Sequence, residues 1–301
     1  MPTRRNVITL LSAALAAAAA PARAQGGGRL KAVATFSILA DFVRRVGGER
    51  VEVTALVGPD GDAHVYAPTP ADSRRLAEAR LVVANGLGFE GWIARLIRAS
   101  GTKAPLVEAA KGTKPLKAAD AHGHGHGADP HAWQNVAHAK VYVAAIRDAL
   151  IAADPEGRGP YEAQAAAYLA ELDALDAEIR AAVAQIPPER RRAITSHEAF
   201  AHFEAAYGLD FVAPQGVSTE AEPSAKDVAR IIQQIRRERI PAVFVETIAD
   251  RRVIERIAQE TGARIGERLY SDALSGADGP APTYIAMMRH NMRALGAALA
   301  R

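Results

Sequence analysis

The sequence contains no cysteine among its 301 residues. Thiolate zinc fingers and dithiol redox motifs are therefore excluded, and any metal site must be built from His, Asp, Glu or water. The absence is compatible with export, because a mature chain of roughly 275 residues can bury a large core without disulfides.

Long hydrophobic runs are also scarce. The longest spans residues 7–20, follows Arg4 and Arg5, and precedes a small-residue pattern at residues 22–24. This order is typical of a secretory signal peptide, so we expect residues 1–24 to be removed. No later run approaches about 18 apolar residues, so no membrane helix is expected in the mature chain. The paired arginines also fit a twin-arginine signal, which leaves both the Sec and the twin-arginine route open.

An excess of charge of one sign is missing from the mature chain. The whole sequence has 37 Lys and Arg against 34 Asp and Glu, a formal charge of +3. The predicted leader holds three Arg and no acid, so 37 − 3 = 34 basic residues face 34 acidic ones. The mature chain therefore lacks the excess of basic residues that is typical of nucleic-acid-binding proteins.

Short apolar runs alternate with helical patterns through most of the chain. The first half has strand-like runs at residues 32–36, 51–57 and 81–85. The alternation resumes after residue 188, with strands expected at 192–195, 211–213, 242–245 and 264–265. A βαβα order favours mainly parallel sheets flanked by helices, so the predicted fold class is α/β.

One long helix is predicted between these halves. Apolar or small residues recur at a spacing of three to four between Tyr161 and Ile186, and Pro187 and Pro188 end the pattern. A helix of about 28 residues would be roughly 40 Å long. We therefore predict two lobes joined by one rigid helix: an N-terminal lobe at 25–153, the linking helix at 154–188 and a C-terminal lobe at 189–301. The alternative is an ordinary long helix packed along a single domain.

Four potential metal ligands stand at nearly even intervals. They are His64, His131, His197 and Asp272, separated by 67, 66 and 75 residues. Each follows a short apolar run and lies among turn-forming residues, where an α/β protein displays side chains at its strand ends. Three imidazoles and one carboxylate complete a tetrahedral zinc shell with no position left for a substrate. The sequence therefore predicts a zinc-binding protein and not an enzyme.

Several segments resemble the solute-binding proteins that feed zinc or manganese to ATP-driven importers, the cluster 9 or A-I family. The resemblance runs through the mature chain in order, at residues 61–70, 129–133, 196–200, 216–224 and 272–274. It implies a two-lobed fold with one buried metal between the lobes, held by the four residues above. It also implies an ABC permease and its ATPase as partners of a monomeric periplasmic protein, with a periplasmic zinc chaperone as a further possible partner.

The metal is expected to be zinc. Manganese-binding members of the family tend to have a carboxylate as the third ligand, whereas this chain has His197. Imidazole suits zinc better than it suits manganese. Glu198, Glu220 and Glu246 are candidates for orienting the imidazole N–H groups. Since the ligands must be deprotonated, affinity should fall as the pH drops through the imidazole range near 6.5.

A second metal feature is the run that contains His122, His124 and His126, each followed by glycine. Such a segment cannot hold a rigid tetrahedron, so we interpret it as an auxiliary site for weak, fast zinc capture. The alternative is a neutral linker. His138, His202 and His290 are expected to be surface or structural histidines.

Three other functions remain as alternatives. A zinc hydrolase is disfavoured because there is no His-Glu-x-x-His, and Pro130 separates Asp129 from His131. A manganese- or iron-binding relative, or a zinc chaperone or adhesin without a permease, could have much the same site. The mature chain would start at Gln25 and not at a cysteine, so we expect no lipid anchor and free diffusion in a periplasm.

Overall fold

The computed structural model describes residues 28–118 and 127–300. The predicted leader and the three histidines of the His-Gly run lie outside the described residues. None of the described helices is long and apolar enough to cross a membrane.

The N-terminal half is built on a four-stranded parallel sheet with the order β2-β1-β3-β4. Its strands are β1 (Leu30–Phe36), β2 (Val51–Val57), β3 (Leu81–Ala84) and β4 (Leu106–Glu108). The helices around it are α1 (Ser37–Gly47), α2 (Pro70–Glu78), α3 (Ile93–Ser100) and α4 (Val136–Ala153). Every residue of β3 is buried, as expected for a strand that is covered on both faces. The sequence predicted three of these strands and missed β4, whose three residues carry little periodic signal.

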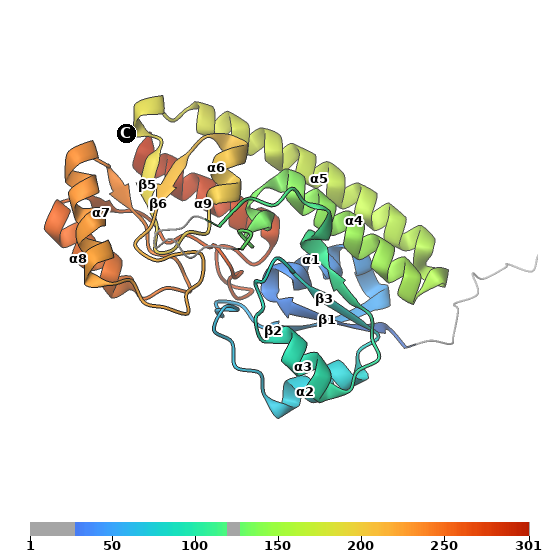
Figure 1. Cartoon of the computed structure of the whole chain (residues 1–301). Helices are drawn as coiled ribbons and strands as arrows, with labels where there is room; N and C mark the ends of the chain where they lie inside the picture. Colours follow the sequence, from blue (N-terminus) through green and yellow to red (C-terminus); the bar gives the residue numbers. More distant parts are fainter. Residues whose placement is uncertain (1–27, 119–126, 301) are drawn as a thin grey trace, which may run out of the picture.

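The C-terminal half repeats the arrangement with shorter strands, in the order β6-β5-β7-β8 and again all parallel. The strands are β5 (Arg192–Ile194), β6 (Asp210–Val212), β7 (Ala242–Val243) and β8 (Arg264–Ile265). The helices are α6 (Ala201–Tyr207), α7 (Ala225–Glu238), α8 (Arg251–Thr261) and α9 (Tyr284–Leu299). Figure 1 shows the two sheets side by side, with the long α5 running across both. The prediction of two α/β lobes with parallel sheets is confirmed.

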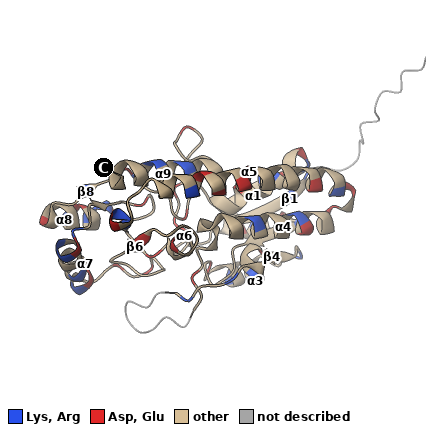
Figure 2. Ribbon diagram, turned by 90° about the horizontal axis from the view of Figure 1, so that it is seen from above, with Lys and Arg blue, Asp and Glu red and all other residues tan. Residues whose placement is uncertain are grey.

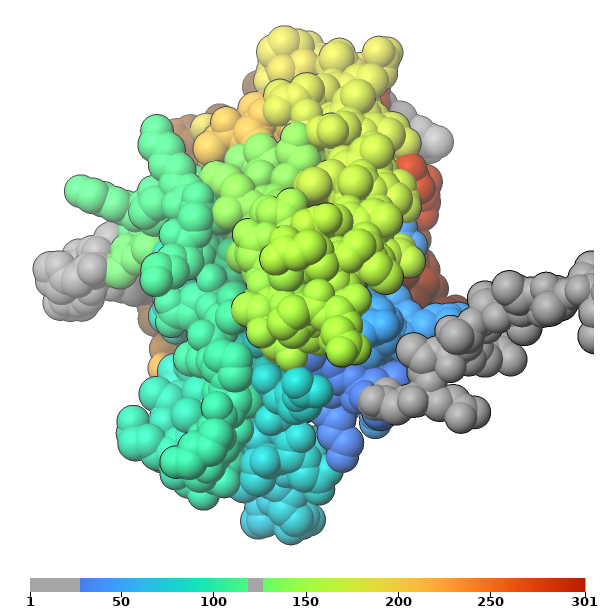
Figure 3. All heavy atoms as spheres, turned by 90° about the vertical axis from the view of Figure 1, so that its right-hand side faces the viewer, coloured from blue at the N-terminus to red at the C-terminus, as the bar shows by residue number. Residues whose placement is uncertain are grey.

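The long helix α5 (Arg158–Ala184) has 27 residues, about 40 Å at 1.5 Å per residue. Its buried residues, from Tyr161 to Val183, follow the predicted spacing of three to four. The helix packs against α1 and α4 of the first half and against α9 of the second. Figure 3 shows the yellow-green α4–α5 pair in contact with blue and teal residues of the first half. The helix is therefore held along its length.

The hydrophobic core is continuous between the two sheets. One cluster contains residues of the first sheet, of α5 and α9, and of the second sheet, including Ala193 and Ala242. A smaller cluster lies beneath α7 and α8 and includes Ile231 and Ile254. At the surface, acidic residues outnumber basic ones along α5, whereas the charged residues of α9 are all basic (Figure 2), and the ion pair between Arg289 and Glu178 joins the two helices. The charge balance of the sequence is thus reproduced as a mixed surface.

Candidate metal centre

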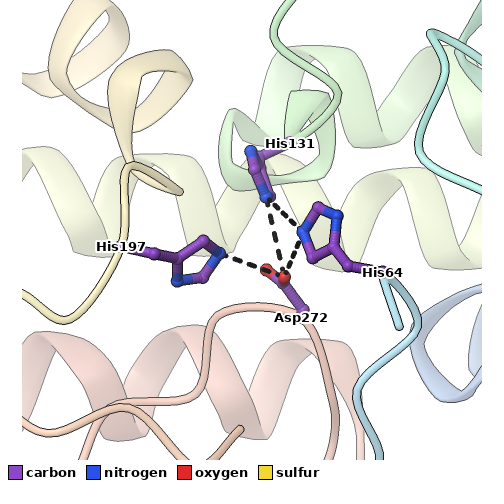
Figure 4. A group of neighbouring side chains, drawn as sticks. All are labelled: His64, His131, His197 and Asp272. Atoms are coloured by element: carbon purple, nitrogen blue, oxygen red, sulfur yellow. Dashed lines mark hydrogen bonds and ion pairs between the residues drawn. The ribbon is translucent and has the colours of Figure 1, made fainter. Parts of the chain in front are cut away.

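The four predicted ligands converge at one point between the lobes. One nitrogen or oxygen from each of His64, His131, His197 and Asp272 lies within 4.8 Å of the others. The Nε2 atoms of the three imidazoles lie 3.1, 3.6 and 3.2 Å from Asp272 Oδ2, in that order (Figure 4). Residues up to 208 positions apart (272 − 64) therefore form a single cluster, as the spacing of the sequence predicted.

Each of these residues follows a strand of one of the two parallel sheets. His64 lies in the loop after β2 and His197 lies three residues after β5. Asp272 lies between β8 and α9, and His131 immediately precedes the short 3-10 helix Ala132–Gln134. The carboxyl ends of parallel strands lie along one edge of a sheet, so two facing sheets place these loops opposite one another.

The centre is shielded from solvent. The side chains of His131, His197 and Asp272 have no exposed surface, and that of His64 is only 4% exposed. His64 borders a cavity of about 610 Å³, which opens beside the loop that carries it. Of the four clustered residues, His64 therefore lies nearest to solvent.

A buried carboxylate orients His131. Asp129 Oδ1 lies 2.8 Å from the backbone N–H of His131 and 2.9 Å from its Nδ1. If Nδ1 carries the proton and donates it to Asp129, Nε2 has a free lone pair directed at the cluster. Burial raises the pKa of Asp129, but the hydrogen bonds and positive charge of His131 hold it below its ordinary value.

A second buried carboxylate supports His197. Glu246 Oε1 accepts hydrogen bonds from the backbone N–H groups of Ser196 and His197, at 2.8 and 2.9 Å. Its Oε2 lies 2.7 Å from His197 Nδ1, and both side chains are fully buried. Of the three glutamates predicted to orient imidazoles, the structure places Glu246 in this position.

The other two glutamates lie differently. Glu220 is exposed and lines the 610 Å³ cavity. Glu198 is half-buried, and its backbone N–H donates to the carbonyl of Gly216. The sequence analysis missed Asp129 as an orienting residue. A sequence signal for this role exists, because an aspartate stands two residues before the histidine at both 129/131 and 62/64. Asp62 Oδ1 likewise accepts the backbone N–H of His64, at 2.8 Å.

The electrostatics of the cluster favour a cation. Burial alone would lower the pKa of His131, but Asp272 and Asp129 raise it to about 9. Burial also opposes protonation of His197, yet Glu246 and Asp272 hold its pKa well above the ordinary value. The imidazoles in turn hold the pKa of Asp272 well below its usual range, against the effect of burial. Without a metal, the centre therefore attracts protons that a metal ion would displace.

The remaining predicted residues are structural or lie outside the described residues. His202 is buried, with Nε2 3.2 Å from the carbonyl oxygen of Asp129. His290 is also buried, and its Nε2 lies 2.8 Å from the carbonyl of Arg268. His138 packs on the ring of His202. Nothing is described for His122, His124 and His126, but the residues on either side pair through an antiparallel bridge between Lys117 and Ala128.

The profile of the family described as "Zinc-uptake complex component A periplasmic" matches residues 32–298. The chain belongs to this family. The match covers both sheets, α5 and all four residues of the centre. It places the protein among the metal-binding solute-binding proteins of ABC importers.

Relatives of known name differ in the metal in that name. The manganese-binding lipoprotein MntA of Halalkalibacterium halodurans is 35% identical over 95% of this chain and 93% of its own length. The iron-binding protein YfeA of Yersinia pestis is 34% identical, over 86% and 83% respectively. Among solved structures, the periplasmic zinc binding protein TroA from Treponema pallidum gives a TM-score of 0.85 at 30% identity, covering 91% of this chain and 100% of that one. The family is therefore established, while the metal has to be argued from the centre itself.

Proposed function

We propose that the protein captures one Zn²⁺ between its lobes in the periplasm and delivers it to an ABC permease and its ATPase. The observation that carries this proposal is the donor set, three imidazole nitrogens and one carboxylate oxygen within 4.8 Å of one another. This set matches the ligands and the coordination number that zinc prefers in closed sites. Two of the imidazoles lie against buried carboxylates, which orient them and raise their basicity.

Manganese or iron is the second candidate, and one feature of the centre favours it. Asp272 Oδ1 is buried and has no hydrogen-bond partner among the described residues. It could serve as a second carboxylate donor, raising the coordination number beyond four, as manganese and iron accept more readily than zinc. The names of MntA and YfeA agree with such a site.

A competition titration separates the two candidates. Metal-free protein would be titrated with Zn²⁺ in the presence of Mn²⁺ or Fe²⁺ and a chelating indicator. Zinc should bind with a stoichiometry of one and at least about a hundred-fold more tightly than manganese. The variants His64→Ala and His131→Ala should lose most of that affinity. Native-like zinc affinity in either variant, or equal affinity for zinc and manganese, would contradict the zinc assignment.

We further propose that the His-Gly run serves as an auxiliary, weak zinc site. The residues that flank it, Ala118 and Gly127, line the same 610 Å³ cavity as His64. They are joined by a hydrogen bond from Ala118 N to Gly127 O of 3.1 Å. The run thus leaves and re-enters the fold at the route to the centre, where transient capture would raise the local zinc concentration.

A further inference from the structure

The segment between β6 and α7, residues 213–224, crosses from one predicted ligand to another. Near its start, Gln215 pairs with His197 through a parallel bridge, and Gly216 accepts the backbone N–H of Glu198 at 3.3 Å. At its end, Ser224 caps α7. The part in between contains Val217, Ser218 and Glu220, which line the cavity beside His64.

Thr219 ties this segment to the opposite lobe. Its Oγ1 donates a hydrogen bond of 2.6 Å to Asp62 Oδ2. The other oxygen of the same carboxylate, Oδ1, accepts the backbone N–H of His64 at 2.8 Å. A single carboxylate therefore links the loop of His64 to the 213–224 segment, which pairs with His197 through Gln215.

The position of this link matters because His64 is the ligand nearest to solvent. The other three side chains of the centre have no exposed surface. The cavity beside His64 is lined by both the His64 loop and the 213–224 segment, which are the two parts that Asp62 and Thr219 join.

The fold of the His64 loop does not depend on Thr219 alone. Asp60 donates its backbone N–H to the carbonyl of Leu274, at 2.8 Å, and Trp92 Nε1 donates to the carbonyl of Ala63, also at 2.8 Å. Loss of the Thr219 hydroxyl would therefore free the contact between the His64 loop and the 213–224 segment while these other anchors remain.

We propose that Thr219 is a positioning residue that acts through Asp62 to hold His64 on the metal, and so sets how long the metal stays bound. The proposal rests on the proposed function, since it needs a metal at the centre. It assigns a role to residue 219 that requires no contact with the metal. A hydrogen bond from a hydroxyl to a carboxylate is among the stronger neutral-donor bonds, so its loss should be visible in a rate.

The test measures zinc release from loaded protein after mixing with an excess of a strong chelator, in a stopped-flow instrument. Thr219→Val keeps the shape of the side chain and removes the donor. Its release rate should be about ten-fold higher than that of the parent, which corresponds to about 1.4 kcal/mol. Thr219→Ser restores the hydroxyl and should bring the rate back to within about two-fold of the parent.

Ser218→Ala is the matched control. Ser218 lies in the same segment and lines the same cavity, but its Oγ accepts a bond from Glu220 N and makes no hydrogen bond to the described residues of the other lobe. Its release rate should match that of the parent. Thermal unfolding of the metal-free variants verifies that the fold is intact.

A release rate of Thr219→Val within about two-fold of the parent would overturn the proposal. Equal acceleration by Ser218→Ala, or failure of Thr219→Ser to restore the rate, would also overturn it, because the segment would then act without the specific bond. If the parent protein binds no zinc, the proposed function fails. If the parent binds zinc normally and Thr219→Val releases it at the same rate, only the role of Thr219 fails.

Discussion

Asp129 holds His131 by two atoms of the same residue, the backbone N–H at 2.8 Å and the imidazole Nδ1 at 2.9 Å. The first contact fixes the turn and the second fixes the ring. Because Asp129 is fully buried, its charge is poorly screened and favours a proton on Nδ1. With the proton on Nδ1, Nε2 keeps a free lone pair that a metal ion could use.

Replacing this carboxylate by an amide should weaken metal binding without destroying the fold. Asp129→Asn keeps an acceptor for the backbone N–H but removes the charge that makes the imidazole basic. We expect zinc affinity to fall about 10–100-fold, measured by competition with a chelating indicator. Asp173→Asn, an exposed carboxylate on α5 that pairs with Lys140, is the control and should bind zinc like the parent. Unchanged affinity in Asp129→Asn would show that this carboxylate does not tune the ligand.

The identity of the residue at position 197 should set the metal preference. His197→Glu exchanges a borderline donor for a hard oxygen and should lower zinc affinity relative to manganese by at least about ten-fold. The new carboxylate would face Glu246, so the variant is best made together with Glu246→Gln, which removes the like charge. His290→Gln replaces a buried histidine outside the centre and should leave the ratio unchanged. A zinc-to-manganese ratio unaffected by the double change would show that position 197 does not select the metal.

Metal binding should release protons at neutral pH. The pKa of His131 is raised to about 9 by Asp272 and Asp129, against the effect of burial, and that of His197 is raised as well. The His131 imidazole is therefore protonated at pH 7 before loading, and zinc must displace that proton. Affinity should rise with pH up to about 9, beyond the unperturbed imidazole range near 6.5. Calorimetry in buffers of different ionisation enthalpy counts the protons, and a count of zero at pH 7 would contradict the arrangement.

Glu204 should make the protein less stable as the pH rises. Burial raises the pKa of this carboxyl to about 7 from 4.5, although the backbone N–H of Phe211 opposes the shift. The folded state therefore holds a proton that the unfolded state loses, and stability falls between pH 4.5 and about 7. Glu204→Gln removes this dependence. It should gain about 1–2 kcal/mol relative to the parent at pH 8, after allowing for partial exposure, and little at pH 4.

Denaturant unfolding of the metal-free protein at the two pH values tests the Glu204 prediction. Glu162→Gln is the control, because Glu162 is an exposed residue of α5 paired with Arg158. An equal effect of Glu204→Gln at both pH values would show that the carboxyl titrates normally.

The His-Gly run should affect how fast zinc is captured and not how tightly it is held. Replacing His122, His124 and His126 by asparagine keeps the length of the run and removes its metal donors. We expect slower zinc association at low zinc concentration and unchanged affinity at the buried centre. Stopped-flow association separates the two quantities. An unchanged association rate would favour the neutral-linker interpretation.

The four-residue cluster could be predicted because the sequence holds few histidines and each of the four residues lies at a recognisable turn. The three orienting contacts were harder to predict. Glu246 follows β7 and is opposed to His197 only because β5 and β7 are neighbours in the sheet, which no local pattern specifies. Asp62 and Asp129 were predictable in principle, since an aspartate two residues before a histidine can accept its backbone N–H.

Some elements of the fold could likewise be predicted from local sequence patterns, whereas others depend on tertiary packing. The limits of β2 match the strand predicted at residues 51–57, because this apolar run has clear ends. The strand predicted at 242–245 is shorter, because only Ala242 and Val243 pair regularly with β8 before the chain turns toward Glu246. The two sheets share one hydrophobic core, and the sequence of neither half predicts this. The shared core depends on how α5 and α9 pack the two sheets together.

The small cluster beneath α7 and α8 implies that the molecule does not come apart evenly. Ile231, Ile254 and their neighbours are separate from the large cluster, and the adjoining strands β7 and β8 have two residues each. Amide protons in α7 and α8 should therefore exchange with solvent through a local opening, whose free energy is lower than that of global unfolding. Those of α5 and β1 should exchange only when the whole chain unfolds. The C-terminal lobe can therefore open locally at α7 and α8 while α5 and β1 keep their structure.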